Sequence, residues 1–148
     1  MLYIIIMSKA SKQKSPTIWD TAISFVPPIT SGHVIKVYDG DTITIASRLP
    51  YEGSPLYKFS VRLNGIDTPE IKTKNPEEKK KALSCKEELS RLCLDQDVEL
   101  QNVNTEKYGR LLADVYCNGV HLNQHMIDGG FAIVYDGGHK KSFEENFS

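Results

Sequence analysis

Residues 57–70 read Tyr-Lys-Phe-Ser-Val-Arg-Leu-Asn-Gly-Ile-Asp-Thr-Pro-Glu, and this stretch decides the fold. Apolar and polar residues alternate over residues 57–63, which predicts a strand with one apolar face and with Arg62 pointing away from it. The Asn-Gly pair that follows allows a tight bend. The Thr-Pro pair can neither continue a strand ladder nor enter a helix, because proline lacks an N–H and restricts the residue before it. Two acids, Asp67 and Glu70, are therefore fixed on a stiff loop beyond a strand that carries a cation.

Two further pieces of the chain carry the same kinds of residue. Asp39-Gly40-Asp41-Thr42 interrupts an alternating run and marks a turn or bulge between two strands. Lys107-Tyr108-Gly109-Arg110 opens another strand run. Carboxylates bind hard divalent cations, and guanidinium groups bind phosphate oxygens in pairs. Acids and arginines on turns beside strands therefore suit a divalent cation and a phosphodiester.

The order and spacing of these three pieces resemble the staphylococcal-nuclease-like (thermonuclease) family, from about Gly32 to about Tyr135. One such piece alone is a weak signal, but three in the same order are a specific one. The resemblance implies an α+β fold: a five-stranded OB-type Greek-key β-barrel with one longer helix and one short helix. A C-terminal helix is expected to be reduced or absent, because few residues follow Tyr135.

Periodicity and turn residues predict the same elements along the chain. Strands are expected at 33–38, 41–46, 57–63, 97–101 and 111–117, with an extended hairpin tip over 47–56 and a hairpin turn at Asn118-Gly119. Asn75 is expected to cap the longer helix, with Pro76 first and an end near Leu94. The short helix is expected to begin with Asn123 as its cap and to end at Gly129-Gly130.

The length of 148 residues allows one domain and a tail. We expect residues 1–31 to form a partly flexible N-terminal tail with a possible short helix, and residues 32–148 to form the barrel domain. Apolar and charged fractions of 40% and 25% are ordinary for a globular protein. The net charge is −1, so binding of nucleic acid would depend on a local cationic cleft and not on bulk charge.

The tail leaves three interpretations open. Ser15 could cap a helix that has Pro16 at its first position and stops at Pro27-Pro28. Such a segment would be strapped onto the barrel by Trp19, would serve as a partner-binding arm, or would be disordered. The apolar residues 1–7 are too few to span a bilayer and lack a basic region, so neither a membrane span nor a signal peptide is expected.

The cysteines and histidines predict no metal or disulfide framework. Three cysteines without a CxxC pair, Cys85, Cys93 and Cys117, indicate buried free thiols in a reducing, cytoplasmic setting. His121 and His125 are four residues apart, but no cysteine or third histidine is near them in the sequence, so we interpret them as surface residues.

The family resemblance assigns roles to nine residues. Asp41 and Asp67 would hold one Ca²⁺ ion with help from the main-chain carbonyl of Thr68. Glu70 would act as general base toward the attacking water. The remaining positions would contact substrate: Arg62 and Arg110 as a clamp on the phosphate, and Lys107, Tyr108 and Tyr135 on the nucleotide.

These assignments imply a Ca²⁺-dependent nuclease acting as a monomer on DNA and RNA. By the resemblance it would prefer single-stranded or frayed regions, discriminate little between bases and leave 3′-phosphate ends. One alternative is a catalytically weak module of the same fold that binds single-stranded nucleic acid or a protein partner. Such a module should lack at least one catalytic residue, and this chain has all of them. An OB-type barrel without metal chemistry is a third interpretation.

Overall fold

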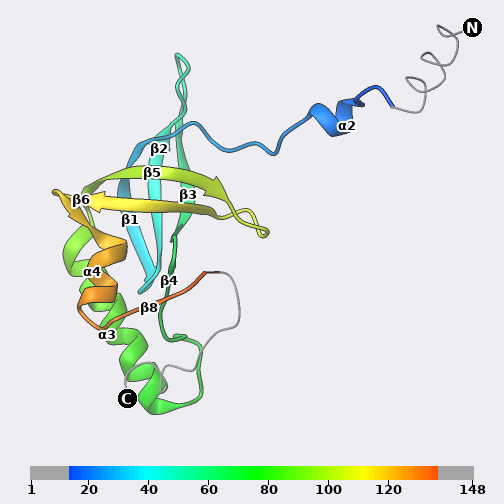
Figure 1. The fold of residues 1–148 in the computed structure, drawn as a ribbon. Helices are drawn as coiled ribbons and strands as arrows, with labels where there is room; N and C mark the ends of the chain where they lie inside the picture. Colours follow the sequence, from blue (N-terminus) through cyan, green and yellow to red (C-terminus); the bar gives the residue numbers. More distant parts are fainter. Residues whose placement is uncertain (1–13, 137–148) are drawn as a thin grey trace, which may run out of the picture.

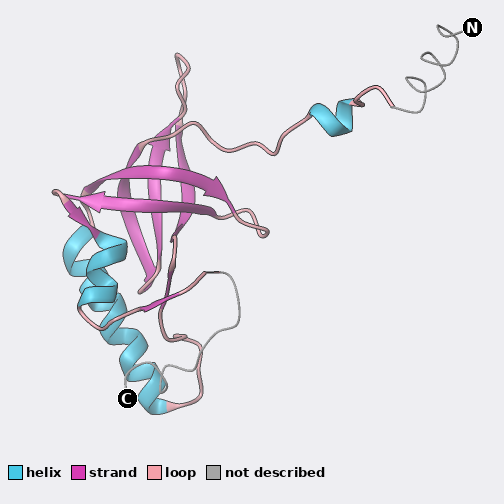
Figure 2. Ribbon diagram, in the orientation of Figure 1, coloured by secondary structure: helices cyan, strands magenta, loops and turns pink. Residues whose placement is uncertain are grey.

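A computed structural model describes residues 14–136 as a barrel with helices at one end and a separate short helix on the N-terminal segment, away from the barrel (Figures 1 and 2). The helices are α2 (Ile18–Thr21), α3 (Pro76–Cys93) and α4 (Leu122–Asp128). The strands are β1 (Ser31–Asp39), β2 (Thr42–Arg48), β3 (Leu56–Leu63), β4 (Ile66–Asp67), β5 (Asp97–Thr105), β6 (Leu111–Cys117), β7 (Val120–His121) and β8 (Ile133–Val134). The expected reduction of a C-terminal helix concerns residues that lie outside the described part.

Five strands close into a barrel, as the sequence predicts. Strand β1 pairs antiparallel with β2 and with β5, β2 pairs with β3, and β5 pairs with β6. A parallel pairing of β3 with β6, in which Val61 lies opposite Leu111, closes the ring. Alternate residues of each strand point inward, so the interior is filled by fully buried aliphatic side chains: Val34, Ile43, Ile45, Val61, Leu63 and Val115. The loop between β2 and β3 projects away from the barrel, as expected (Figure 1).

Helix α3 forms where its sequence signals place it. The Asn75 side-chain oxygen accepts hydrogen bonds from the N–H groups of Glu77 and Glu78 at 3.0 and 3.3 Å, and Pro76 follows the cap. One stripe of the helix is buried against the barrel: Ala82, Cys85, Leu89 and Cys93. The helix therefore closes the end of the barrel with an apolar face and leaves its charged face in water.

Helix α4 begins two residues earlier than predicted, with His121 and not Asn123 at the cap position, because the Asn123 side chain makes other hydrogen bonds. Asn123 is buried, and its side-chain oxygen accepts the N–H of Val115 at 2.9 Å. Its amide donates to the carbonyls of Asn64 and Ala113 at 2.9 and 3.1 Å. The residue that caps α4 is His121, which makes no side-chain capping bond. Asn123 thus ties α4 and β6 to the turn that leads into β4.

The N-terminal segment differs from the expectation in two ways. Its helix is a single turn capped by Thr17, whose hydroxyl accepts the Asp20 N–H at 3.2 Å while the Asp20 carboxylate accepts the Thr17 N–H at 3.0 Å. This reciprocal capping outcompetes Ser15 as the start of the helix. Trp19 is 89% exposed, so the interpretation that it straps the segment onto the barrel is wrong.

The three cysteines are free and buried, as predicted. Burial raises the pKa of Cys93 to about 12, so this thiol stays protonated in the folded protein at neutral pH. Within residues 14–136, no helix has the length and apolar character needed to cross a membrane.

Replacing Asn123 by leucine should lower the free energy of unfolding by about 2–4 kcal/mol. Leucine has a similar volume, but it leaves the buried Val115 N–H and the partly buried Asn64 carbonyl without their partner. Urea denaturation checks this, with Gln124→Ala on the exposed side of the same helix as control. A change below about 0.5 kcal/mol in Asn123→Leu would show that the network is not needed for stability.

Candidate active site

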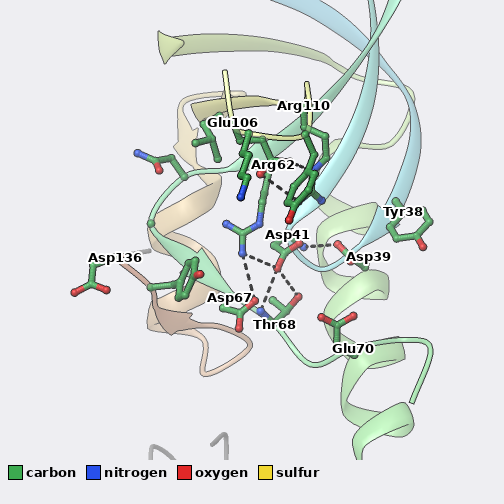
Figure 3. A pocket seen from close by; sticks show the side chains of 16 residues that line it. Tyr38, Asp39, Asp41, Arg62, Asp67, Thr68, Glu70, Glu106, Arg110 and Asp136 are labelled. Carbon is green, nitrogen blue, oxygen red and sulfur yellow. Dashed lines mark hydrogen bonds and ion pairs between the residues drawn. The ribbon is translucent and has the colours of Figure 1, made fainter. Parts of the chain in front are cut away.

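All nine residues singled out from the sequence line one cleft of about 970 Å³ at the end of the barrel (Figure 3). The cleft lies between the β1–β2 turn, the β3–β4 segment, the β5–β6 turn and the chain that follows β8. Its lining is Tyr38, Asp39, Asp41, Arg62, Asn64, Gly65, Asp67, Thr68, Glu70, Glu106, Lys107, Tyr108, Arg110, Leu112, Tyr135 and Asp136. The fold therefore brings together three sequence pieces that are far apart along the chain.

The β1–β2 turn fixes Asp41 against helix α3. The Asp39 carboxylate accepts the N–H of Asp41 at 3.0 Å, the turn role expected of Asp39. A Cβ atom at Gly40 would lie only 2.6 Å from Cβ of Cys85 and 3.0 Å from Cγ2 of Thr68. Only glycine allows the turn to approach the helix so closely. Asp41 is consequently 6% exposed and held by contacts on both sides.

The Asp41 carboxylate also fixes the loop that carries the other acids. It accepts hydrogen bonds from the Thr68 N–H and hydroxyl, both at 3.2 Å, and from the Thr42 hydroxyl at 2.9 Å. The β1–β2 turn and the Asp-Thr-Pro-Glu loop are thus joined by the side chain that the sequence predicts to be a metal ligand. The carboxylate lies at the floor of the cleft (Figure 3).

Arg62 lies between the two buried carboxylates. Its Nη2 atom is 3.3 Å from Oδ1 of Asp67 and 3.6 Å from Oδ2 of Asp41 (Figure 3). The three side chains are at most 11% exposed, and the Arg62 guanidinium also lies over the Tyr135 ring, 5.3 Å from its centroid. Buried charges require partners. Here the Arg62 guanidinium lies close to both carboxylates.

A short strand pair that the sequence did not predict holds Asp67 and Tyr135. Strand β8 pairs antiparallel with β4, with Asp67 opposite Ile133. The Tyr135 N–H donates to the Gly65 carbonyl at 2.8 Å. The Cys85 thiol donates to the Phe131 carbonyl at 3.0 Å, which anchors this segment to α3. Two-residue strands carry no periodic signal, so residues 131–135 were expected only as the end of the domain.

Arg110 is paired with Glu106, a residue that sequence reasoning missed. Gly109 takes a positive φ of 86° in the turn between β5 and β6, and the turn brings the two side chains together. The Arg110 Nε and Nη2 groups donate to the two carboxylate oxygens of Glu106. These hydrogen bonds raise the pKa of Arg110. The sequence did contain a signal for this pair, because Glu106 precedes Arg110 by four residues and the Tyr-Gly turn lies between them.

The remaining predicted residues lie at the rim of the cleft. Glu70 is exposed and follows the buried Pro69, so its carboxylate faces the cleft from a stiff support (Figure 3). Tyr108 is 81% exposed, and the Lys107 Nζ atom lies 6.0 Å from its ring centroid. These two residues stand at the tip of the β5–β6 turn, at the open edge of the cleft.

Negative charge accumulates in this cleft. Burial and the nearby Asp41 carboxylate raise the pKa of Asp39 to about 7, and Glu70 contributes to the shift. Within residues 14–136, no group of three or more His, Cys, Asp or Glu side chains has a metal-binding arrangement. Two convergent carboxylates beside main-chain carbonyls are nevertheless donors that suit a hard divalent cation. The excess of anions over cations around them also fits such an ion.

The two histidines take no part in the cleft. His121 stacks on Tyr116, with ring centroids 4.6 Å apart, and His125 lies 4.0 Å from the carboxylate of Glu88. Both are half-buried and packed against neighbours, so they are less exposed than the surface residues expected from the sequence.

Comparison with known proteins agrees with this geometry. The model of a family described as "Staphylococcal nuclease homologue" matches residues 60–147, more than half of the chain. An uncharacterized protein of Bacillus anthracis is 34% identical over 106 residues, which are 70% of this chain and 46% of that protein. An Arabidopsis thaliana protein named staphylococcal-like nuclease CAN1 is 32% identical over 82 residues, 53% and 24% of the two chains.

An uncharacterized endonuclease of Haemophilus influenzae is 33% identical over 102 residues, which are 69% of this chain and 51% of that protein. This chain therefore spans about half, or less, of the length of these relatives.

Asp39→Asn should change how stability depends on pH in buffer that contains a chelator. The folded-state pKa of about 7 lies above the ordinary value of 3.8, so the wild-type protein loses stability as pH rises through this interval. Asparagine has no proton to lose. The melting temperature of Asp39→Asn relative to wild type should therefore be higher at pH 8 than at pH 5. An equal difference at both pH values would show that Asp39 titrates normally.

Proposed function

The chain belongs to the staphylococcal nuclease homologue family, and from this premise we propose that it is a Ca²⁺-dependent nuclease that hydrolyses phosphodiester bonds of DNA and RNA. One observation carries the proposal. Two buried carboxylates, Asp41 and Asp67, converge on Arg62 at the floor of a cleft that also contains Glu70 and Arg110. The desolvation of buried charges can cost more free energy than their pairing returns, so stability alone is a weak explanation for this cluster.

The donors for the metal come from two segments. Asp41, Asp67 and the main-chain carbonyl of Thr68 would hold one Ca²⁺ ion, leaving further positions for water and for phosphate oxygens. When bound, this ion supplies Lewis-acid polarisation of the phosphate and stabilises the charge that builds on it. The hydrogen bonds from Thr68 and Thr42 to Asp41 orient its carboxylate before any ligand arrives.

The two arginines would bind the phosphate. Hydrolysis gathers negative charge on the non-bridging oxygens, and planar guanidinium groups can donate two parallel hydrogen bonds to them. Arg62 is already rigid, because it is held by two carboxylates and the Tyr135 ring. Arg110 is presented by the β5–β6 turn with Glu106 behind it.

Glu70 would act on the water. A general base has to reach the attacking water in line with the leaving oxygen, and Glu70 faces the cleft from the loop that also carries Asp67. Its exposed position makes the carboxylate accessible to solvent water. The water oxygen would attack phosphorus as its proton passes to Glu70, the bond from phosphorus to the 5′ oxygen would break, and the released 5′ oxygen would take a proton from solvent. By family analogy the products would be a 3′-phosphate and a 5′-hydroxyl.

The rim would bind the nucleotide without choosing its base. Lys107, Tyr108 and Tyr135 offer one charge and two aromatic rings, which address phosphate and base faces and not base edges. Aromatic stacking requires unpaired bases, so single-stranded or frayed DNA and RNA are the preferred substrates in this proposal. The alternative is a module that binds without cutting, which the engagement of Arg110 by Glu106 would favour.

Cleavage of supercoiled plasmid and of single-stranded RNA tests the proposal. The purified wild-type protein should cut both with Ca²⁺ and neither with chelator. Glu70→Gln removes the base and Arg110→Ala removes half of the phosphate clamp, so each should lower the rate by roughly 10²–10⁴-fold. Initial rates at matched protein concentration measure the effect, and circular dichroism confirms that both variants are folded.

Matched controls lie outside the cleft. Glu52→Gln at the β2–β3 loop and Arg91→Ala on α3 alter exposed residues of the same types and should keep full activity. Cleavage that persists in both cleft variants would contradict the assigned site. A folded wild-type protein that binds strands but cuts nothing under any condition would favour the binding module instead.

A further inference from the structure

Tyr38 lies in a β-bulge at the edge of the cleft. In the β1–β2 ladder Val37 pairs with Ile43, and Asp39 pairs with Thr42, so Tyr38 is an extra residue on β1. A bulge of this kind bends its strand and redirects a side chain, and bulges are common beside active sites. Here Tyr38 lines the cleft and is 44% exposed, between the buried Val37 and the half-buried Asp39.

A lysine accompanies the ring. The Lys36 Nζ atom lies 5.8 Å from the centroid of Tyr38, close enough for a cation–π contact. This contact helps to hold the ring at the rim of the cleft. The pair repeats the combination of Lys107 with Tyr108 on the opposite turn, where the distance is 6.0 Å.

Tyr38 lies on one side of the acids in the cleft. In Figure 3, Tyr38 lies beside Asp39 on one side of the Asp41–Arg62 pair, and Asp136 lies on the other side. Asp136 follows Tyr135, whose ring contacts Arg62. Tyr38 and Tyr135 both line the cleft that contains the carboxylates, so a nucleic-acid strand bound there would meet two aromatic rings.

We propose that Tyr38, held by Lys36, is a stacking platform for the base of a nucleotide next to the cleaved phosphate, in a single-stranded oligonucleotide. The inference rests on the proposed function and adds a second base subsite, on the β1 side of the cleft. Stacking on an aromatic face does not distinguish between bases, because every base has a π face. The subsite would thus add affinity for unpaired strands without adding sequence preference.

A pair of hexamer ligands separates base stacking from phosphate binding. Hexathymidylate and a hexamer of the same backbone without bases are titrated by calorimetry with Ca²⁺, on a Glu70→Gln background that prevents cleavage. Tyr38→Ala should weaken hexathymidylate binding by about 10-fold, as expected for the loss of one stacked base. It should leave binding of the base-free strand within about twofold.

Matched variants distinguish the loss of the Tyr38 ring from other changes to the protein. Tyr38→Phe keeps the aromatic ring and should bind both hexamers as tightly as the Glu70→Gln background protein. Lys36→Gln should lower the affinity for hexathymidylate about threefold, because the ring is less well held. Tyr51→Ala alters an exposed tyrosine at the β2–β3 loop and should change nothing. Arg110→Ala should weaken both strands equally, since it addresses phosphate.

The outcomes separate this inference from the function on which it rests. One outcome is that the wild-type protein cuts but Tyr38→Ala, on the Glu70→Gln background, binds hexathymidylate as tightly as the background protein does. The proposed stacking role of Tyr38 is then wrong, and the proposed nuclease function stands. Equal losses for both hexamers in Tyr38→Ala would also overturn the stacking role, because they would indicate a disturbed cleft and not a lost stack. A wild-type protein that neither cuts nor binds either strand would overturn both.

Discussion

One guanidinium shared between two buried carboxylates is the interaction on which the rest of this structure depends. Arg62 lies within 3.6 Å of both Asp41 and Asp67, and none of the three can leave its place without stranding a buried charge. The surrounding fold serves this arrangement. Gly40 lets one carboxylate approach helix α3, the β4–β8 pair holds the other, and β3 closes the barrel beneath the arginine.

The same arrangement explains how a stable fold can contain reactive groups. The fixed contacts hold the carboxylates and Arg62 before a ligand arrives, so little reorganisation is needed when charge develops on a phosphate. Arg110 differs, because two of its three guanidinium nitrogens, Nε and Nη2, already donate to Glu106. A phosphate must compete with Glu106 or use the remaining face of the guanidinium. Glu106 therefore both positions Arg110 and limits how strongly it can bind.

Sequence reasoning succeeded where the pattern was long or the chemistry local. The barrel strands alternate over five or more residues, and Asn75-Pro76 marks the start of α3 by capping chemistry alone. The fold places all nine candidate residues in one cleft, and their roles stay predictions. Sequence reasoning failed where a tertiary contact overrides a local preference. Asn123 could cap a helix, but its side chain instead bonds to main-chain groups 8, 10 and 59 residues away. Strands β4 and β8 are too short to show a period.

The near-neutral net charge, which counts against a nucleic-acid-binding protein on composition, has a local explanation in the cleft. Among the described residues that line it, six are acids and three are lysine or arginine. A cleft of this composition repels a polyanionic strand until a divalent cation reverses part of its charge. In the proposed function, cation and strand therefore bind cooperatively, and by linkage each must raise the affinity for the other by the same factor. A basic surface is then unnecessary, because the cation supplies the missing charge at the place where the phosphate has to lie.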